Sequence, residues 1–467
     1  MSASSNDVRL AGCELYFLPV RTRVPLKFGP ETLTEVTCVR VRVRVSHPTR
    51  GNAEGWGETP LSVQWVWPSE LPHAERRQTL LEFCARLGAA WAAFGESGHP
   101  MEISSAFQSQ ELPNLVAEMN RQRAGREPMP WLAALVCFSA FDLALQDAYG
   151  ALHQRPVYTT YNAEFMSRDL SAYLTPADPA VSFAGKYPEH FLRPQRADRL
   201  TAWHLVGGLD PLDASELTAS SPQDGYPVAL TDWIATDGLT CLKIKLKGTD
   251  ATWDFARLVR VGEIGLGRGV QWLTADFNCT VQAPEYVIEI LERLRREHPA
   301  IYAQLLYVEQ PFPYELAEHR IDVHGVSALK PLFLDESAHD WQVVRLGREL
   351  GWTGVALKTC KTLTGALLSA AWAQAHGMAL MVQDLTNPML AQISHVLLAA
   401  HVNTIMGVET NSMQFYPAAS LPEAAVHPGL YRRRGGMVDL SSVSGPGLGY
   451  RLAEIQRPLP AAAGSWW

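Results

Sequence analysis

The sequence has few cysteines, and no two of them stand in a CxxC spacing. Its 7 cysteines, which run from Cys13 to Cys360, are odd in number and disfavour both a disulfide framework and a zinc site. Residues 1–12 lack the apolar core of a signal peptide. No apolar run approaches the roughly 18 residues that a membrane-spanning helix needs. We therefore expect a reduced, cytoplasmic protein without a membrane partner.

Positive charge is also scarce. The chain carries 40 Lys and Arg against 48 Asp and Glu, a net charge of −8, whereas a protein that neutralises nucleic-acid phosphates needs an excess of cations. The densest basic stretch, Val39–Val45, alternates Val with Arg and predicts a strand with one buried and one solvated face. We expect no nucleic-acid partner.

Apolar residues are abundant, at 47% of the chain against 19% charged, so 467 residues can bury a large core in two or three domains. Strand patterns at Glu14–Val20 and Thr37–Val45 open the chain, and helical patterns follow. A long apolar helix within Trp131–Tyr158 ends near Gly150 and makes a natural boundary. We expect an α+β capping domain over residues 1–157 and, because the composition turns polar and turn-rich, an insertion or connection over 158–201.

Short apolar runs recur beyond residue 201, each followed by a helix-compatible stretch. From the second onward each run ends in a polar residue, and these ends lie 23 to 33 residues apart. The eight runs are Ala202–Val206, Cys241–Lys245, Gln271–Asp276, Leu305–Glu309, Pro331–Asp335, Gly354–Lys358, Ala379–Gln383 and Asn403–Glu409. Eight parallel strands joined by helices close into a barrel, which we expect over 202–415.

A doubly wound open sheet is the alternative, and it would need a glycine fingerprint directly after a strand. The one glycine cluster of that kind, Gly265–Gly269, precedes a strand and is interpreted as a turn. Residues 416–467 contain hairpin-like pieces that cannot extend a closed barrel, so we expect them to return to the capping domain.

Charged residues at the strand ends form a series that packing does not require. In a barrel these ends face one mouth, where barrel enzymes keep their chemistry. Asp276, Glu309 and Asp335 end three consecutive strands, and three oxygen ligands with room for water suit Mg²⁺. Each carboxylate alone could cap the following helix, but together at this spacing they favour a metal site.

Two lysines, Lys243 and Lys245, lie two residues apart on one strand and therefore point to the same side, into the barrel. We expect their mutual repulsion to lower the pKa of one of them, leaving an amine able to accept a proton. Lys358 ends a strand nearly opposite. Lysines on both sides of a bound substrate suit removal and return of a proton α to a carboxylate, since the dianion that forms needs nearby cations.

These motifs resemble the enolase superfamily, and specifically its muconate-lactonising (muconate cycloisomerase) subgroup. The matching segments are CLKIKLKG, TADFN, VEQPF, FLDES and VALKTCK in the barrel, with GWGETPL, FDLALQDAYG and SGPGLGYRL outside it. The resemblance spans nearly the whole chain except residues 159–200. It implies a modified TIM barrel, (β/α)7β, with an N-terminal α+β capping domain completed by the C-terminal tail.

The resemblance also implies site roles. Asp276, Glu309 and Asp335 would bind Mg²⁺, Lys245 and Lys358 would be acid/base residues on opposite faces, and Lys243 would be an electrostatic partner. Further residues would contact or surround the substrate: Asn278, Glu336, Glu409, Gln383 and the cap-loop residues Lys27 and Phe28. Glu409 could hold a cationic substrate group, as in dipeptide epimerases, or be structural. Segments near Lys27 and at Thr59–Ser62 would be mobile loops.

The implied function is a Mg²⁺-dependent isomerase or lyase that removes the proton α to a small-molecule carboxylate. Racemase or epimerase, cycloisomerase and dehydrating synthase activities all remain open, on dipeptide, N-acyl amino acid or diacid substrates. The resemblance also favours a homo-oligomer.

Three departures from the family pattern bear on this hypothesis: a missing glycine pair, the insertion and a missing histidine. The glycine pair that usually follows the sixth-strand lysine is absent, so Lys361 rivals Lys358. That departure and the insertion leave room for a non-catalytic carboxylate-binding protein or scaffold. The seventh strand ends in Gln383 and Asp384 without the histidine of the mandelate racemase subgroup, which argues against a sugar-acid dehydratase.

Overall fold

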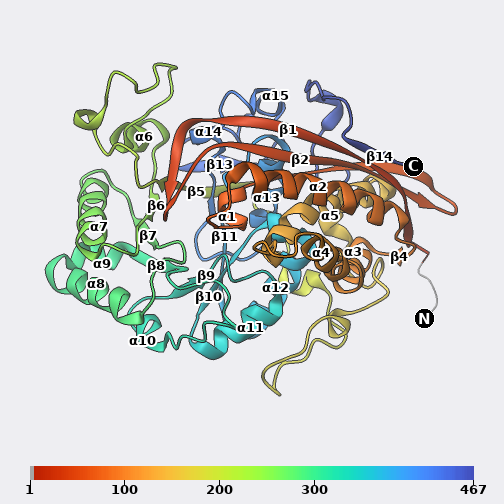
Figure 1. Cartoon of the computed structure of the whole chain (residues 1–467), viewed down its shortest axis with the longest axis horizontal. Coiled ribbons are helices and arrows are strands. Elements are labelled where there is room, and N and C mark those ends of the chain that lie inside the picture. The colour runs from red at the N-terminus through yellow and green to blue at the C-terminus, as the bar shows by residue number, and fades with distance from the viewer. Residues whose placement is uncertain (1–4) are drawn as a thin grey trace.

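The computed structural model describes residues 5–467, in which a strand-rich cap sits beside a barrel of parallel strands (Figure 1). The cap elements are β1 (Val8–Phe28), β2 (Glu31–His47), β3 (Gly51–Leu61), α1 (Val63–Val66), α2 (His73–Ala93), β4 (Ser97–Gly98), α3 (Pro100–Gln110), α4 (Leu112–Gln122) and α5 (Trp131–His153). The cap sheet has the order β14-β1-β2-β3, with β4 also paired to β1. Strands β1, β2 and β3 pair antiparallel.

Strand β2 follows the alternation of its sequence. The valines from Val39 to Val45 are fully buried, whereas Arg42 and Arg44 are partly exposed. Arg40 is the exception, because it is 2% exposed and donates from Nε to Glu58 Oε2 at 2.5 Å and from Nη2 to Glu423 Oε1 at 3.2 Å. The predicted strand is therefore present, but its polar face carries one buried arginine that pairs with two carboxylates.

Helix α5 packs unusually close to β3. A Cβ added at Gly55 or Gly57 would lie 2.0 Å or 2.1 Å from backbone atoms of Ala148 and Ala140, so only glycine permits this approach. By length and mean hydropathy α5 could cross a membrane, contrary to the expectation that no such segment exists. However, 89% of its most apolar window is buried in the protein, which is typical of a core helix.

Residues 154–198, between α5 and the first barrel strand, form three 3₁₀ turns and a run of loops. The turns are η1 (Val157–Thr160), η2 (Leu170–Ala172) and η3 (Pro188–Phe191). This segment packs on the barrel helix that follows β10: Trp372 Nε1 donates to Thr175 O at 3.0 Å and Gln374 Nε2 to Phe191 O at 2.8 Å. It lies away from the strand ends described below.

The barrel sheet has the order β11-β10-β9-β8-β7-β6-β5-β12, with parallel pairing throughout, and β13 adds antiparallel to β5. One bridge between Leu380 and Thr404 joins its two edges. The strands are β5 (Arg199–Val206), β6 (Cys241–Lys245), β7 (Trp272–Asp276), β8 (Leu305–Glu309), β9 (Leu332–Leu334), β10 (Gly354–Leu357), β11 (Ala379–Val382), β12 (Val408–Glu409) and β13 (Met437–Asp439). The modified TIM barrel with a cap is the predicted fold class.

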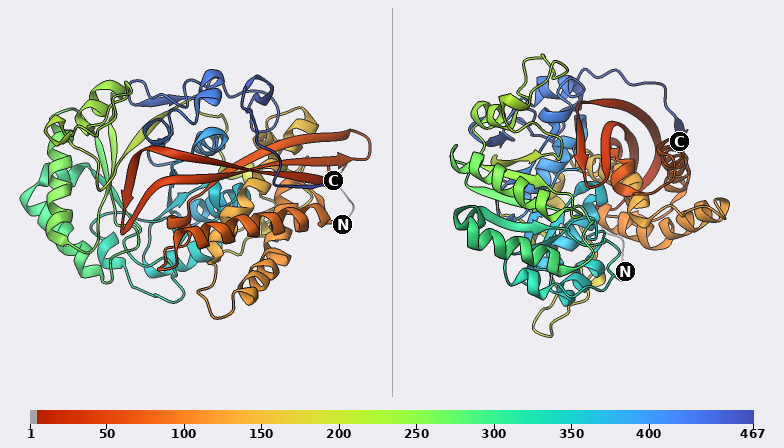
Figure 2. Two further views of the ribbon diagram at one scale, coloured as in Figure 1. Left: turned by 45° about the horizontal axis from the view of Figure 1, so that its top comes forward. Right: turned by 60° about the vertical axis from the view of Figure 1, so that its left-hand side comes forward.

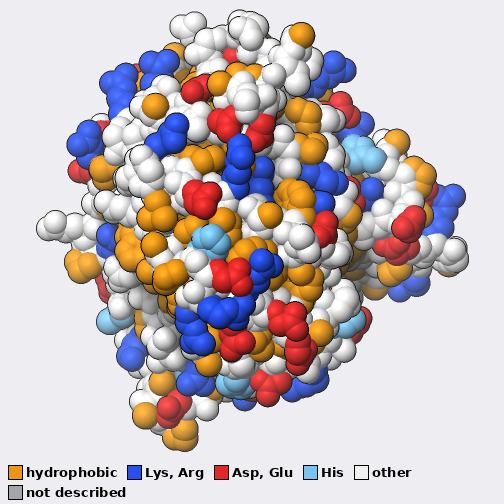
Figure 3. Space-filling model, turned by 90° about the vertical axis from the view of Figure 1, so that its left-hand side faces the viewer, with side chains coloured by type: hydrophobic (Ala, Val, Ile, Leu, Met, Phe, Trp, Pro, Cys, Tyr) orange, Lys and Arg blue, Asp and Glu red, His pale blue; other side chains and the backbone are white. Residues whose placement is uncertain are grey.

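The barrel helices follow their strands. They are α6 (Leu230–Asp237), α7 (Ala251–Leu266), α8 (Pro284–Glu297), α9 (Pro299–Gln304), α10 (His324–Ser327), α11 (Trp341–Leu350), α12 (Leu363–Ala375) and α13 (Met389–His401), with 3₁₀ turns η4 (Ala214–Glu216) and η5 (Thr359–Lys361). On the outer face of the barrel, acidic and basic side chains are interspersed (Figure 3). After β12 come α14 (Ser412–Phe415), α15 (Leu421–Val426), η6 (Leu452–Glu454) and β14 (Gly464–Trp466), which pairs with β1 and so returns the chain to the cap sheet.

The long strands β1 and β2 extend from the cap across the barrel (Figure 2). At their barrel end the carbonyl of Lys27 accepts a hydrogen bond from Gly208 N at 3.0 Å, just beyond β5. The barrel interior below is filled by buried side chains of five strands: Trp203, Cys241, Tyr307, Phe333 and Met381. This packed layer is the floor on which the charged residues stand.

Candidate active site

The charged side chains at the carboxyl ends of the barrel strands meet at one place. Strand register places Lys245 beside Asp276 and Asp276 beside Glu309, so consecutive strands present them at one level. Asp276 and Glu309 are fully buried, and Asp335, directly after β9, is 1% exposed. The predicted carboxylate cluster is therefore brought together.

Lys243 holds the centre of this cluster. Its Nζ lies 2.6 Å from Glu309 Oε1, 3.1 Å from Asp276 Oδ2 and 3.1 Å from Glu409 Oε2. Lys245 Nζ donates to the same Asp276 Oδ2 at 2.5 Å. Two ammonium groups thus compensate three buried carboxylates, as buried charges require.

Lys358 enters from the opposite side of the barrel, four strands from Lys245. Its Nζ donates to the carbonyl of Asp384 at 2.7 Å and lies 3.2 Å from Asp335 Oδ2. Lys245 and Lys358 line the same small cavity, whereas Lys361 does not. Lys361 Nζ instead donates to the backbone carbonyls of Asp335 at 2.6 Å and Ala356 at 3.5 Å. The geometry therefore favours Lys358 over Lys361 as the sixth-strand acid/base residue.

Burial and mutual charge set the pKa values of the acids. Burial raises the pKa of Asp276, but Lys245 and Lys243 outweigh it and hold that pKa below its usual value. Burial also raises the pKa of Asp335, which Lys358 and Lys361 then bring below its usual value. For Glu309, burial and the neighbouring Asp276 dominate and raise the pKa well above its usual value.

The lysines do not behave as repulsion alone predicts. Burial lowers the pKa of Lys243, but Glu309, Glu409 and Asp276 overcome it, and the pKa is raised well above its usual value. Repulsion from Lys245 was expected to lower the pKa of a neighbouring lysine, and for Lys243 this is wrong. Three carboxylates in direct contact with Lys243 raise its pKa instead. The pKa of Lys358 is also raised, since Asp335 outweighs burial. Burial lowers the pKa of Lys361.

The carboxylates fit a hard divalent cation in donor type and placement. Asp276, Glu309 and Asp335 are oxygen donors from three consecutive strands. Asp335 Oδ1 is buried and accepts no hydrogen bond, although Lys361 Nζ lies 3.5 Å away. As placed, no three His, Cys, Asp or Glu side chains within residues 5–467 form a ready ligand group, because Lys243 bridges Asp276 and Glu309. A bound cation would take over the charge compensation that Lys243 now provides.

The cap closes over the lysines. The cavity of about 30 Å³ between Lys245 and Lys358 is roofed by Phe28, from the end of β1, and Trp65, from α1. Trp65 stacks its ring 5.2 Å from Lys358 Nζ, and Phe28 lies 6.0 Å from Lys245 Nζ. Lys27 was expected to contact the substrate, but it does not line this cavity. Its Nζ instead donates to Pro30 O at 2.6 Å.

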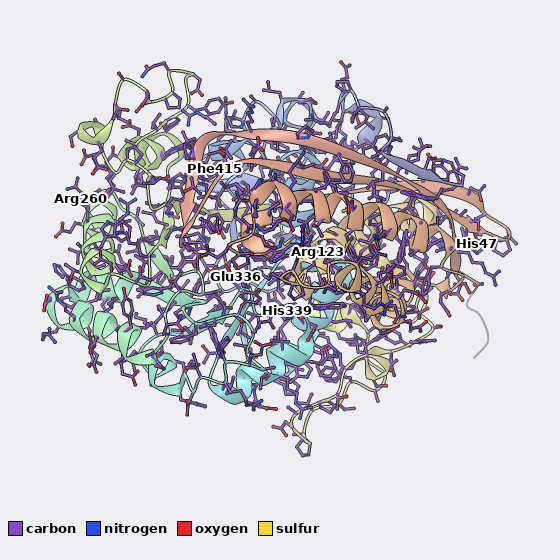
Figure 4. The ribbon with its side chains drawn as sticks, viewed as in Figure 1. His47, Arg123, Arg260, Glu336, His339 and Phe415 are labelled. Atoms are coloured by element: carbon purple, nitrogen blue, oxygen red, sulfur yellow. The ribbon has the colours of Figure 1, made fainter. Side chains whose placement is uncertain are left out.

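Four other predicted residues surround the cluster. Asn278 Nδ2 donates to Glu336 Oε1 at 3.4 Å, and Glu336 lies at the centre of the molecule between cap and barrel (Figure 4). Burial and Asp335 raise the pKa of Glu336 to about 7. Gln383 lies below the cavity, where Nε2 donates to Glu309 and to Tyr307 Oη. Glu409 borders the cavity, but both its oxygens are occupied, by Lys243, Asp384 N and Asn411.

Three residues contact the site although the sequence did not indicate it. Trp65 Nε1 donates to Glu336 Oε1 at 2.9 Å, a contact between cap and barrel that no spacing signals. Gln310 Oε1 accepts from Asp335 N at 2.8 Å and so fixes the end of β9. Its position directly after Glu309 was the available signal. The carbonyl of Asp384, which receives Lys358, carries no side-chain signature at all.

The backbone is strained at the same strand ends. Asn278, Cys279, Gln310 and Thr386 all have positive φ, at 49°, 63°, 30° and 57°, although none is glycine. Such residues persist only where the surroundings hold them, and they concentrate at functional sites. The strained segments follow β7, β8 and β11, at the mouth of the barrel.

Fold and site together define a capped-barrel protein whose mouth carries opposed lysines around three carboxylates. Residues 228–456 match the family model described as "Enolase C-terminal domain-like". The barrel region of the chain, residues 228–456, therefore belongs to this enolase-like family.

Known relatives agree with this placement. An aromatic dipeptide epimerase from Herpetosiphon aurantiacus is 26% identical over 250 residues, which are 52% of this chain and 65% of that relative. The chain thus matches slightly less than two thirds of that relative's length. A dipeptide epimerase from Enterococcus faecalis, solved with Mg and L-Leu-L-Tyr, has a TM-score of 0.61 at 16% identity and covers 94% of this chain and 99% of its own. A Pseudomonas fluorescens muconate lactonizing enzyme complexed with muconolactone has a TM-score of 0.59 at 17% identity, with 96% and 99% covered.

Proposed function

We propose that the protein is a Mg²⁺-dependent enzyme that removes and returns the proton α to a carboxylate, as a racemase or epimerase or as a cycloisomerase. One observation carries the proposal: Lys245 and Lys358 line one cavity from strands on opposite sides of the barrel, with Asp335 between them. The names of the relatives support the reaction class, and dipeptides, N-acyl amino acids and diacids are the candidate substrates.

The chain's own residues account for the proton transfers. Lys245 removes the α-proton from one face, and Lys358 delivers a proton to the other face, which inverts the α-carbon. Lys243 places its own ammonium group beside the carboxylate oxygens of the substrate, on which negative charge develops. Asp276, Glu309 and Asp335 would hold Mg²⁺, which supplies Lewis-acid stabilisation of that charge. Phe28 and Trp65 exclude water above the lysines.

Substrate entry requires the cap to open. A cavity of about 30 Å³ holds no more than a water molecule, so the segments that carry Phe28 and Trp65 must move away to admit substrate. The proposal also takes residues 1–157 as the cap, 202–415 as the catalytic barrel and 416–467 as the returning tail. A cytoplasmic location and a homo-oligomer belong to the same proposal.

Deuterium uptake at the α-carbon tests this function. Dipeptides, N-acyl amino acids and lactone-forming diacids are incubated with Mg²⁺ in heavy water and followed by mass spectrometry, with Lys245→Ala alongside. We expect the wild-type protein to exchange the α-proton of both enantiomers, and Lys245→Ala to lose exchange of the enantiomer whose α-proton faces Lys245. Exchange of both enantiomers by Lys245→Ala contradicts the assigned base. Mg²⁺ binding without exchange of any compound would favour a non-catalytic carboxylate-binding protein.

A further inference from the structure

A second cavity, of about 220 Å³, lies beside the lysine cavity and shares Phe28 and Trp65 with it. Its walls come from the cap and from the loops that follow β7, β8 and β9. It is large enough for an amino-acid side chain, whereas the lysine cavity is not. Because Phe28 and Trp65 of the cap border both cavities, one substrate can reach both when the cap opens.

Three buried oxygens in the walls of this second cavity have no hydrogen-bond donor. They are Gln64 Oε1 from α1, Asn278 Oδ1 from the loop after β7, and Glu336 Oε2 from the loop after β9. Glu336 is 4% exposed, and its other oxygen already accepts from Trp65. A buried acceptor without a donor costs free energy, so three around one cavity call for a ligand that brings N–H groups.

The charge of the walls restricts the ligand further. The residues lining the second cavity include two acids, Glu31 and Glu336, and no lysine or arginine. The first cavity is lined instead by both signs of charge, with Lys245 and Lys358 beside Asp335, Asp384 and Glu409. Aromatic faces of Phe28, Trp65 and Tyr314 complete the second cavity, and such faces attract cations.

We propose that this second cavity is a subsite for a cationic group of the substrate, an ammonium or guanidinium carried by the side chain on the reacting carbon. The inference rests on the proposed function, in which the carboxylate of the substrate lies beside the lysines. The cationic end then donates to Glu336, Asn278 and Gln64 between the aromatic rings. A neutral side chain of equal length would bring no N–H donor to Glu336 Oε2, Asn278 Oδ1 and Gln64 Oε1, which disfavours it.

A pair of isosteric ligands tests the subsite without relying on turnover. N-acetyl-L-lysine and N-acetyl-L-norleucine share the carboxylate and the four-carbon side chain, and differ by the ammonium group. Calorimetric titration of the full-length protein with Mg²⁺ present should show at least about tenfold tighter binding of the lysine compound, the range expected for one charged hydrogen-bonding group. Equal binding, or tighter binding of the norleucine compound, overturns the inference.

Two variants with opposite expected effects locate the selectivity. Gln64→Glu adds a negative charge to the cavity and should raise the lysine-to-norleucine affinity ratio, whereas Glu336→Gln should lower it toward one. Because each ratio is taken within one variant, a general loss of folding or metal binding cancels. The matched control is Gln78→Glu, which adds the same charge on the exposed face of α2 and should leave the ratio unchanged. A ratio that falls in Gln64→Glu contradicts the assignment.

Deuterium exchange separates this inference from the proposed function. If the lysine compound binds selectively but no compound exchanges its α-proton, the catalytic proposal fails and the subsite stands. If several compounds exchange but charge on the side chain makes no difference to affinity or to kcat/KM, the subsite fails and the catalytic proposal stands.

Discussion

Replacing Lys243 by Met tests whether its ammonium group is the counter-ion of the buried carboxylates. The Lys243 side chain is 2% exposed, and its Nζ lies within 3.1 Å of Glu309, Asp276 and Glu409. Removing one partner of a buried ion pair typically costs about 3–5 kcal/mol. Here Asp276 keeps Lys245 and Glu409 keeps Asn411, so Glu309 loses most, and we expect about 3 kcal/mol.

The assay is urea unfolding at pH 7, followed by tryptophan fluorescence, with Lys247→Met as control. Lys247 lies two residues beyond β6, its side chain is 44% exposed, and its ion pair with Asp250 spans 3.6 Å. A surface pair of that kind contributes about 0–1 kcal/mol. Mg²⁺ should stabilise Lys243→Met more than the wild-type protein, because no ammonium then competes for Asp276 and Glu309.

The reasoning is refuted if Lys243→Met costs no more than Lys247→Met, or if Mg²⁺ stabilises both forms equally. The first result would mean that the carboxylates are protonated or solvated without Lys243. The second would mean that the cation binds elsewhere.

Three further predictions follow from the same contacts. Because the pKa of Glu336 is raised to about 7, the folded protein holds a proton that the unfolded chain releases near pH 4, and stability falls as pH rises between these values. Glu336→Gln should flatten that part of a urea-midpoint profile, and an unchanged slope would contradict the assignment. For the enantiomer whose α-proton faces Lys358, Lys358→Met should slow exchange by about 10²- to 10⁴-fold and Lys361→Met by less than about tenfold, since only Lys358 lines the cavity. The reverse order would assign the role of Lys358 to Lys361. Removal of metal with a chelator should abolish exchange and Mg²⁺ should restore it, while full activity in the chelator would exclude the metal role.

The periodic elements of this fold were accessible from sequence. Strand β8 was predicted with its observed bounds, Leu305–Glu309, because a short apolar run ends there in a charged residue between two helices. The carboxylates and lysines of the site followed from the same strand ends. Strands β1 and β2 are longer than predicted, since their outer parts lack a clean alternation and are held by pairing with each other.

Contacts between the cap and the barrel were not accessible in the same way. Trp65 belongs to no motif in the sequence, yet it lies over Lys358 and donates to Glu336, 271 residues along the chain. Repulsion between Lys243 and Lys245 was expected to lower the pKa of one of them, but Glu309 and Glu409 from other strands raise the pKa of Lys243. Hydrophobic periodicity and motif spacing predict at which strand end a residue lies. Which side chains from other elements contact it is decided by tertiary packing.

The central claim, that two lysines act on opposite faces of one carbon, is tested most directly by exchange of each enantiomer in the single-lysine variants. N-acetyl-L-lysine and N-acetyl-D-lysine are incubated separately with Lys245→Met and with Lys358→Met in heavy water containing Mg²⁺, and α-deuterium is measured by mass spectrometry. We predict that each variant keeps exchange of one enantiomer and loses the other, with opposite enantiomers lost in the two variants. Loss of the same enantiomer in both, or exchange of both enantiomers in either, would contradict the account.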